Sequence, residues 1–135
     1  MSRRNGNFIN GWIVVDKPVS VTSTQVVSLL RRRLNARKCG HAGTLDPLAS
    51  GVLPIAFGEA TKIIPLVMEG VKTYEFSVRW GEERSTDDAE GSVTGLSSYR
   101  PKEADILAIT SKFTGEIEQT PPKFSAIKIN GHRAY

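Results

Sequence analysis

The chain has 135 residues, of which 39% are hydrophobic and 24% charged, so it is long enough to form one domain with its own core. It has no apolar run long enough to span a bilayer, and residues 1–10 lack the apolar segment of a signal peptide. The single cysteine, Cys39, excludes an intramolecular disulfide and a cysteine-based zinc site and favours a reducing cytoplasm.

Positive charge is concentrated in the first part of the chain. Residues 1–50 have a net charge of +6, and residues 51–135 have a net charge of −2. This excess indicates a polyanionic partner, although a solvated basic helix face would give the same pattern. Five cations lie between Arg31 and Lys38, and we expect them to contact phosphates beside the glycine-rich loop at 40–51.

The first half of the chain predicts two strands with a helix between them. Residues 12–15 are apolar and largely β-branched, which favours a buried strand. Thr22 and Gln25 have the spacing of a capping box, so a helix should follow. Residues 52–57 form a second apolar run, in which Pro54 indicates an edge strand or the start of a strand. The buried stripe of the helix is expected to comprise Val26, Val27, Leu30 and Leu34.

The middle of the chain predicts a helix, a strand and a loop. Residues 59–68 favour a short helix that Pro65 interrupts. Residues 72–80 give the clearest strand prediction, because apolar side chains alternate with polar ones. The acidic run at 81–91 lacks the spacing of an EF-hand and predicts a mobile loop. The inward side chains of the helix should be Ile63, Ile64, Leu66 and Val67, and the aromatic face of the strand should be Tyr74, Phe76, Val78 and Trp80.

The last part of the chain predicts a surface helix and a hairpin. Residues 101–113 have helical spacing, and residues 124–129 alternate as a strand does. Asn130–Gly131 is typical of a tight hairpin turn. Because the return strand of this hairpin would extend past Tyr135, we expect the sequence to be cut short. The buried side of the helix should comprise Ile106, Leu107, Ile109, Thr110 and Phe113.

The loop at 40–51 presents one carboxylate, Asp46, and an apolar strand follows it directly. Asp46 precedes Pro47, which favours an extended backbone and a side chain that stands out from the loop. Such a carboxylate could be catalytic, or it could accept a backbone hydrogen bond in an Asx turn. The glycines match neither of the common phosphate-binding motifs, so no nucleotide cofactor is predicted.

Three segments, at 11–23, 40–54 and 57–62, together resemble the bacterial tRNA pseudouridine synthase B family and, less closely, its archaeal and eukaryotic guide-RNA-dependent relatives. The resemblance implies an α+β fold with a mixed, mostly antiparallel sheet flanked by helices. It implies that 1–135 is the N-terminal portion of a catalytic domain and that the C-terminal RNA-binding domain is absent. The implied activity is a cytoplasmic isomerase that converts uridine 55 in the T-loop of tRNA to pseudouridine, without a metal, nucleotide or redox cofactor.

The resemblance also assigns site residues. Asp46 would be the catalytic carboxylate, and it would either add to C1′ of the sugar or take the 2′ proton. His41 would contact the rearranged loop after the base is flipped out. Tyr74 would stack on the extruded base, and Lys62 would lie near the RNA backbone. The arginine that pairs with the aspartate in this family comes from a later segment, which has no counterpart in these 135 residues.

The implied partner is the T-arm stem-loop of tRNA, with no DNA or membrane partner, and the full-length form is expected to be a monomer. The motif Asp16–Pro18 is interpreted as structural, holding the first strand against the active loop. Two alternatives stay open: a non-catalytic RNA-binding fragment that keeps only the scaffold and the basic patch, and a guide-RNA-dependent pseudouridine synthase subunit.

Overall fold

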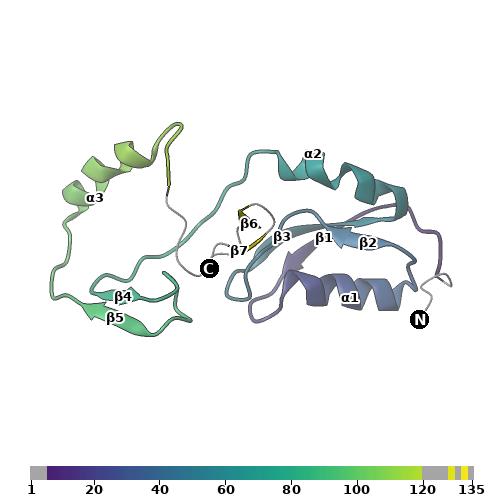
Figure 1. Ribbon diagram of the computed structural model, residues 1–135, viewed down its shortest axis with the longest axis horizontal. Helices are drawn as coiled ribbons and strands as arrows, with labels where there is room; N and C mark the ends of the chain where they lie inside the picture. Colours follow the sequence, from purple (N-terminus) through teal and green to yellow (C-terminus); the bar gives the residue numbers. More distant parts are fainter. Residues whose placement is uncertain (1–5, 120–127, 130–131, 134–135) are drawn as a thin grey trace. The chain divides into compact units, whose positions relative to one another are not determined.

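The computed structural model describes residues 6–119, 128–129 and 132–133. The chain divides into two compact units, Met1–Thr73 and Tyr74–Tyr135, and each is considered by itself. The fold is α+β, as predicted, with helices and antiparallel sheets (Figure 1). The first unit contains β1 (Gly11–Lys17), α1 (Ser23–Arg33), β2 (Cys39–His41), β3 (Gly51–Phe57), η1 (Gly58–Ile63) and α2 (Ile64–Met68).

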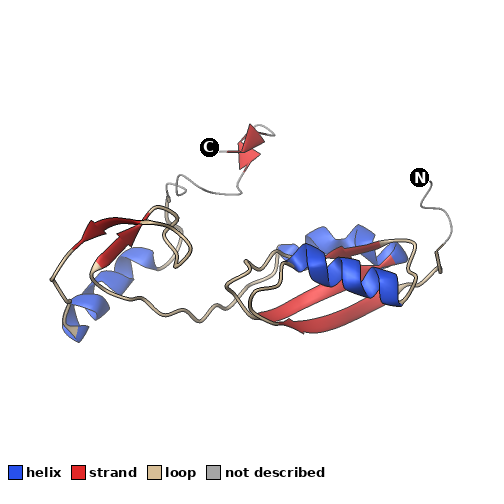
Figure 2. Ribbon diagram, turned by 90° about the horizontal axis from the view of Figure 1, so that it is seen from below, coloured by secondary structure: helices blue, strands red, loops and turns tan. Residues whose placement is uncertain are grey.

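The first unit is a three-stranded antiparallel sheet in the order β1-β3-β2, and α1 runs along it (Figures 1 and 2). Alternate residues of the central strand, Leu53, Ile55 and Phe57, are fully buried and form the core together with Val26 of α1. The predicted helix is confirmed. Thr22 Oγ1 accepts from the backbone N–H of Gln25, and the Gln25 side chain accepts from Thr22 N. Val27, Leu30 and Leu34 pack against the core, as expected.

The prediction that Pro54 marks an edge strand or a strand start is wrong, because β3 is the central strand. The carbonyl of Pro54 accepts from Ala42 N at 2.9 Å, so its ring nitrogen faces the same neighbour. β2 ends at His41, one residue earlier. The missing donor of Pro54 therefore falls where the pairing with β2 stops, and it costs the ladder little.

The segment after β3 is helical, but it differs from the prediction in two ways. It is a 3₁₀ helix, η1, followed by the short α2, and Pro65 lies in the first turn of α2 where its missing N–H is tolerated. Of the four side chains expected to face inward, Ile63, Leu66 and Val67 are exposed and only Ile64 is half-buried.

The second unit contains two short hairpins and a helix. β4 and β5 pair antiparallel, and so do β6 and β7. The second pair joins Lys128 to Arg133 on either side of the predicted turn, while 130–131 and 120–127 lie outside the described residues. The elements are β4 (Glu82–Arg84), β5 (Val93–Leu96), α3 (Glu103–Thr110), η2 (Ser111–Phe113), β6 (Lys128–Ile129) and β7 (His132–Arg133).

The strand predicted at 72–80 is wrong. These residues form no strand, and the side chains of its aromatic face are exposed, from 43% for Trp80 to 80% for Phe76. An extended segment becomes a strand only when another strand satisfies its N–H and C=O groups. The described residues supply no such neighbour for this segment. The predicted buried side of the helix at 101–113 is wrong for four of its five residues. Ile106 is half-buried, and the exposed side chains are Leu107, Ile109, Thr110 and Phe113.

The acidic loop at 81–91 is tied down by one arginine. The Arg84 guanidinium donates to Glu82 Oε2 at 2.8 Å, to the carbonyl of Gly91 at 2.8 Å and to the carbonyl of Ala89 at 3.4 Å. The Asp88 carboxylate accepts from Thr86 Oγ1 and from Glu90 N, and these bonds lower the pKa of Asp88. Residues 82–84 of this run form the strand β4 rather than a loop, and the mobility expected of the rest stays a prediction.

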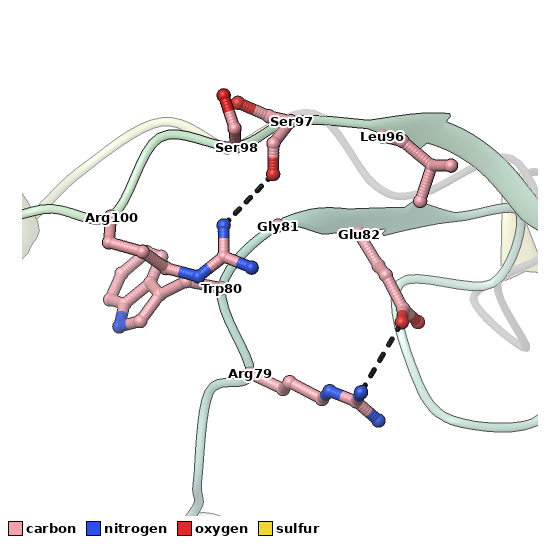
Figure 3. Close-up of a pocket in the computed structure, with 8 residues that line it drawn as sticks. All are labelled: Arg79, Trp80, Gly81, Glu82, Leu96, Ser97, Ser98 and Arg100. Carbon is pink, nitrogen blue, oxygen red and sulfur yellow. Dashed lines mark hydrogen bonds and ion pairs between the residues drawn. The ribbon is translucent and has the colours of Figure 1, made fainter.

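A shallow pocket of about 390 Å³ lies beside β4 and β5 in the second unit (Figure 3). Arg79 pairs with Glu82 at 3.7 Å on one side of it. On the other side, the Arg100 guanidinium donates to the carbonyl of Ser97 at 2.9 Å. Both arginines are thus already engaged by groups of this unit.

Among the residues that the structure describes, no helix is long and apolar enough to cross a membrane.

Candidate active site

Asp46 is exposed on the loop between β2 and β3, as the sequence predicts. Its backbone carbonyl accepts from Ala49 N at 3.0 Å, which closes a turn with Pro47 at the second position. Within the described part of the chain, its carboxylate takes part in no hydrogen bond or ion pair. The hydrogen bond that would define an Asx turn at Asp46 is therefore not formed, and the carboxylate is available to a ligand.

The loop that carries Asp46 is held to the start of α1 by Ser23. Ser23 is only 2% exposed, and its hydroxyl accepts from Leu45 N at 3.0 Å and donates to Leu45 O at 3.1 Å. Both backbone groups of the residue before Asp46 are thus bonded to one buried side chain. The sequence gives no role to Ser23. Its only signal is a hydroxyl directly after the helix cap, and the partner lies 22 residues away along the chain.

A second contact comes from the turn between β1 and α1. Ser20 N donates to the carbonyl of Pro47 at 2.6 Å, and Ser20 adopts a positive φ of 65°. Lys17 also holds this turn. It is fully buried, and its Nζ donates to the carbonyls of Pro18 and Val21. These bonds agree with the structural role expected for Asp16–Pro18, because they fix the turn that contacts the loop.

His41 lies at the end of β2, at the start of the same loop. Its Nδ1 is 2.6 Å from the carbonyl of Gly43, and because a carbonyl can only accept, Nδ1 carries the proton. This leaves Nε2 of the half-buried ring for another partner. Asp46 and His41 are therefore both carried by the segment that joins β2 to β3.

Lys62 lies on η1, which begins at the end of β3 away from the Asp46 loop. Its ammonium is paired with the Glu59 carboxylate, and this hydrogen bond and charge lower the pKa of Glu59. Tyr74 is the first residue of the second unit and is 66% exposed. Within the first unit, the structure thus places Asp46 and His41 on the segment from β2 to β3 and places Lys62 at the other end of β3, while Tyr74 belongs to the second unit.

The cations at 31–38 begin at the end of α1 that lies away from Asp46, so they do not surround Asp46 itself, and their expected contact with phosphates stays a prediction. The loop is bonded to Ser23 at the beginning of α1, whereas Arg31, Arg32 and Arg33 form its last turn. An α-helix of 11 residues is about 16 Å long. Figure 1 shows the end of α1 and the segment before β1 together at one end of this unit.

The described residues contain no group of three or more histidine, cysteine, aspartate and glutamate side chains that could hold a metal ion. Cys39 is half-buried at the start of β2, and burial raises the pKa of its thiol despite the nearby Arg31. A raised pKa keeps the thiol protonated at neutral pH, which fits a packing role.

Comparison with known proteins shows the family of the chain. The model of the TruB family pseudouridylate synthases (N terminal domain) matches residues 31–135, a range that includes β2, Asp46 and β3. The chain belongs to this family. The tRNA pseudouridine synthase B of Bartonella bacilliformis is 63% identical over 134 residues, which are 99% of this chain and 42% of that protein. The tRNA pseudouridine synthase B of Bradyrhizobium diazoefficiens is 61% identical over 133 residues, which are 98% of this chain and 39% of that protein.

The chain thus spans about two fifths of the length of these TruB relatives. Among solved structures, the crystal structure of a Cbf5-Nop10-Gar1 complex contains a chain that is 32% identical, with a TM-score of 0.58. The match covers 87% of this chain and 31% of that chain. The family assignment agrees with the resemblance inferred from residues 11–23, 40–54 and 57–62.

Proposed function

We propose that this protein is a tRNA pseudouridine synthase, an isomerase that converts uridine 55 in the T-loop of tRNA to pseudouridine, with Asp46 as its catalytic carboxylate. The observation that carries the proposal is an exposed carboxylate on a loop held by Ser23 of α1 and by the turn at Ser20, in a chain of the TruB family. The name shared by relatives about 60% identical supports tRNA as the substrate.

The chemistry needs one carboxylate near the sugar of the target nucleotide. The bond from C1′ to N1 of uracil breaks, the base turns, and a bond from C1′ to C5 forms. C5 then loses its proton and N1 gains one, so no electrons are exchanged with another molecule. Asp46 would act at the sugar, either as a nucleophile toward C1′ or as a base toward the 2′ proton. Both routes require an ionised and exposed carboxylate, which suits the position of Asp46.

The other site residues take roles around the flipped base. Extrusion of the uridine costs a few kcal/mol, and a tyrosine such as Tyr74 would recover about 1–3 kcal/mol by stacking on the base. His41 would contact the rearranged RNA loop through Nε2, because Nδ1 is bonded to the carbonyl of Gly43. Lys62 would contact the RNA backbone only by giving up or sharing Glu59, and this exposed pair is screened by water.

The proposal includes the setting of this chemistry. The substrate would be the T-arm stem-loop of tRNA, and the protein would act as a cytoplasmic monomer. Residues 1–135 would be the N-terminal portion of the catalytic domain, since the family model that matches residues 31–135 describes an N-terminal domain.

Tritium release from C5 of labelled uridines tests the proposal. A T-arm stem-loop is incubated with the full-length protein and, in parallel, with its Asp46→Asn variant. We expect release by the parent, none by Asp46→Asn, and similar RNA affinity for both. Glu69→Gln, which removes another exposed carboxylate of the first unit, should behave as the parent does. Full release by Asp46→Asn would show that another residue is the catalytic group.

A second candidate function is a subunit of a multiprotein synthase. It is favoured by the likeness to a chain from the Cbf5-Nop10-Gar1 complex, at 32% identity. The higher identity to the tRNA pseudouridine synthases B favours the first candidate. Release of tritium from the bare stem-loop, with no other protein or RNA added, would exclude a requirement for further subunits.

A further inference from the structure

Four exposed cations, Arg32, Arg33, Arg37 and Lys38, extend from the last turn of α1 to the start of β2, and we call them the basic corner. None of them forms an ion pair within the part of the chain that the structure describes. The carboxylate in electrostatic range of Lys38 is Glu59, and it is already paired with Lys62. The charge of the basic corner is therefore left for a partner.

The backbone beneath the basic corner is held by the segment before β1. Asn7 N donates to the carbonyl of Asn35 at 2.6 Å, and Arg37 N donates to the carbonyl of Asn7 at 3.1 Å. The Asn7 side chain donates to the carbonyl of Leu34 at 3.1 Å, at the end of α1. These three hydrogen bonds hold the C-terminal end of α1, where helices commonly fray.

Two arginines in this region have defined side-chain positions. The Arg37 guanidinium lies over the Phe8 ring, 4.6 Å from its centre, and this contact holds the charge in place. Arg31 folds back to the carbonyls of Ala36 and Arg37, so it serves the backbone rather than a ligand. Because the Arg37 side chain is already held, it loses less side-chain entropy when it binds an anion.

The basic corner is separated from the Asp46 loop by the length of α1. The loop is bonded to the start of this helix and the basic corner begins at its last turn, and 11 helical residues span about 16 Å. Along an RNA stem this distance corresponds to roughly five nucleotide steps, taking the ~3.4 Å spacing of a nucleic acid strand. Guanidinium groups bind phosphate oxygens with good geometry, and such contacts fix the register of a nucleic acid without reading its bases.

We propose that the basic corner binds backbone phosphates of the RNA stem several nucleotides away from the uridine at Asp46. This inference rests on the proposed function. The basic corner sets how the stem is oriented, while the Asp46 loop selects and converts the target nucleotide. Substrate affinity then depends on the length of the stem as well as on the loop.

The test compares two stem-loops that share one loop but differ in stem length. The short RNA has a stem of about three base pairs closed by a covalent cross-link, and the long RNA has about nine, which extends past the ~16 Å that separates Asp46 from the basic corner. Binding to the full-length protein is measured by fluorescence anisotropy over a range of salt concentrations. The variant is Arg32→Gln/Arg33→Gln, since glutamine is as good a helix former as arginine.

The matched control is Lys102→Gln/Lys112→Gln, which makes the same change of charge in the second unit at exposed residues. Circular dichroism and thermal unfolding check that both variants fold as the parent does. We expect Arg32→Gln/Arg33→Gln to bind the long RNA about tenfold more weakly at low salt. The slope of log affinity against log salt should become shallower by about 0.9 for each phosphate that the variant no longer neutralises. Binding to the short RNA should not change, and the control should match the parent on both RNAs.

An equal loss on both RNAs, or no loss beyond that of the control, would overturn the inference and leave the proposed function standing. Failure of the parent protein to bind either RNA would overturn the proposed function as well. A misfolded Arg32→Gln/Arg33→Gln protein is replaced by Lys38→Gln, which lies outside α1. The same comparison then decides.

Discussion

Ser23 should position the Asp46 loop, and Ser23→Ala tests this directly. The substitution removes one hydroxyl and breaks two hydrogen bonds, one to Leu45 N and one from Ser23 to Leu45 O. Ser23 is 2% exposed, so water does not easily replace the missing group. Each unsatisfied buried backbone group costs about 1–3 kcal/mol. Because Leu45 itself is half-buried, we expect a total loss of about 2–3 kcal/mol in the free energy of unfolding.

Thr22→Ala is the matched control for this prediction. It removes the neighbouring hydroxyl and the cap of the same helix, but it leaves the contact with Leu45 intact. Loss of an N-cap costs about 1 kcal/mol. The two variants therefore separate damage to α1 from release of the loop.

The measurements are urea unfolding and the tritium-release assay. Because small misplacements of a catalytic group are costly, Ser23→Ala should lower kcat by about 10–100-fold with little change in KM. Thr22→Ala should leave kcat near that of the parent. Equal stability and equal kcat for the two variants would refute the argument that Ser23 positions Asp46.

Three further predictions follow from the first unit. Gly58→Ala should lower the free energy of unfolding by more than about 2 kcal/mol, because φ is 57° and the new Cβ would meet the carbonyl of Ile9. Gly70→Ala, whose Cβ would meet only the carbonyl of Val67 at 3.4 Å, should cost less in the same urea titration. Lys17→Met should cost about 1–3 kcal/mol for each of the two carbonyls that lose the ammonium, as measured by thermal unfolding. Burial raises the pKa of the Cys39 thiol above its ordinary value of 9.0. The unfolded chain therefore loses this proton first, stability falls as the pH rises above about 9, and unfolding of Cys39→Ser should lack this decline.

Local sequence patterns correctly predicted the elements whose stabilising contacts are made between residues close together in the sequence. The capping box at Thr22 and Gln25 and the helical spacing after it are local, and α1 follows them. The strand prediction at 72–80 failed because alternation describes a side chain pattern, whereas a strand also needs a hydrogen-bonding neighbour. Pro54 misled because the position of a strand in a sheet depends on where the neighbouring β2 ends.

The candidate site shows the same division. The exposure of Asp46 follows from the local chemistry of an Asp-Pro pair among glycines. The clamp by Ser23 could not be predicted, because it joins residues 22 positions apart. The expectation that the cations at 31–38 flank the loop assumed that nearness along the chain means nearness in space. The chain runs back along β2, so the loop is bonded to the start of α1 whereas the cations begin at its end, about 16 Å along the helix.

Arg31 shows that a run of identical residues can be under different evolutionary constraints. Its Nε and Nη2 atoms each donate to a separate carbonyl, those of Ala36 and Arg37, both at 3.3 Å. A lysine has a single ammonium and cannot reproduce this fork. Arg32 and Arg33 are not proposed to make such a forked contact, and a phosphate can bind either an arginine or a lysine. Among relatives, position 31 should therefore stay arginine, while positions 32 and 33 drift freely between arginine and lysine.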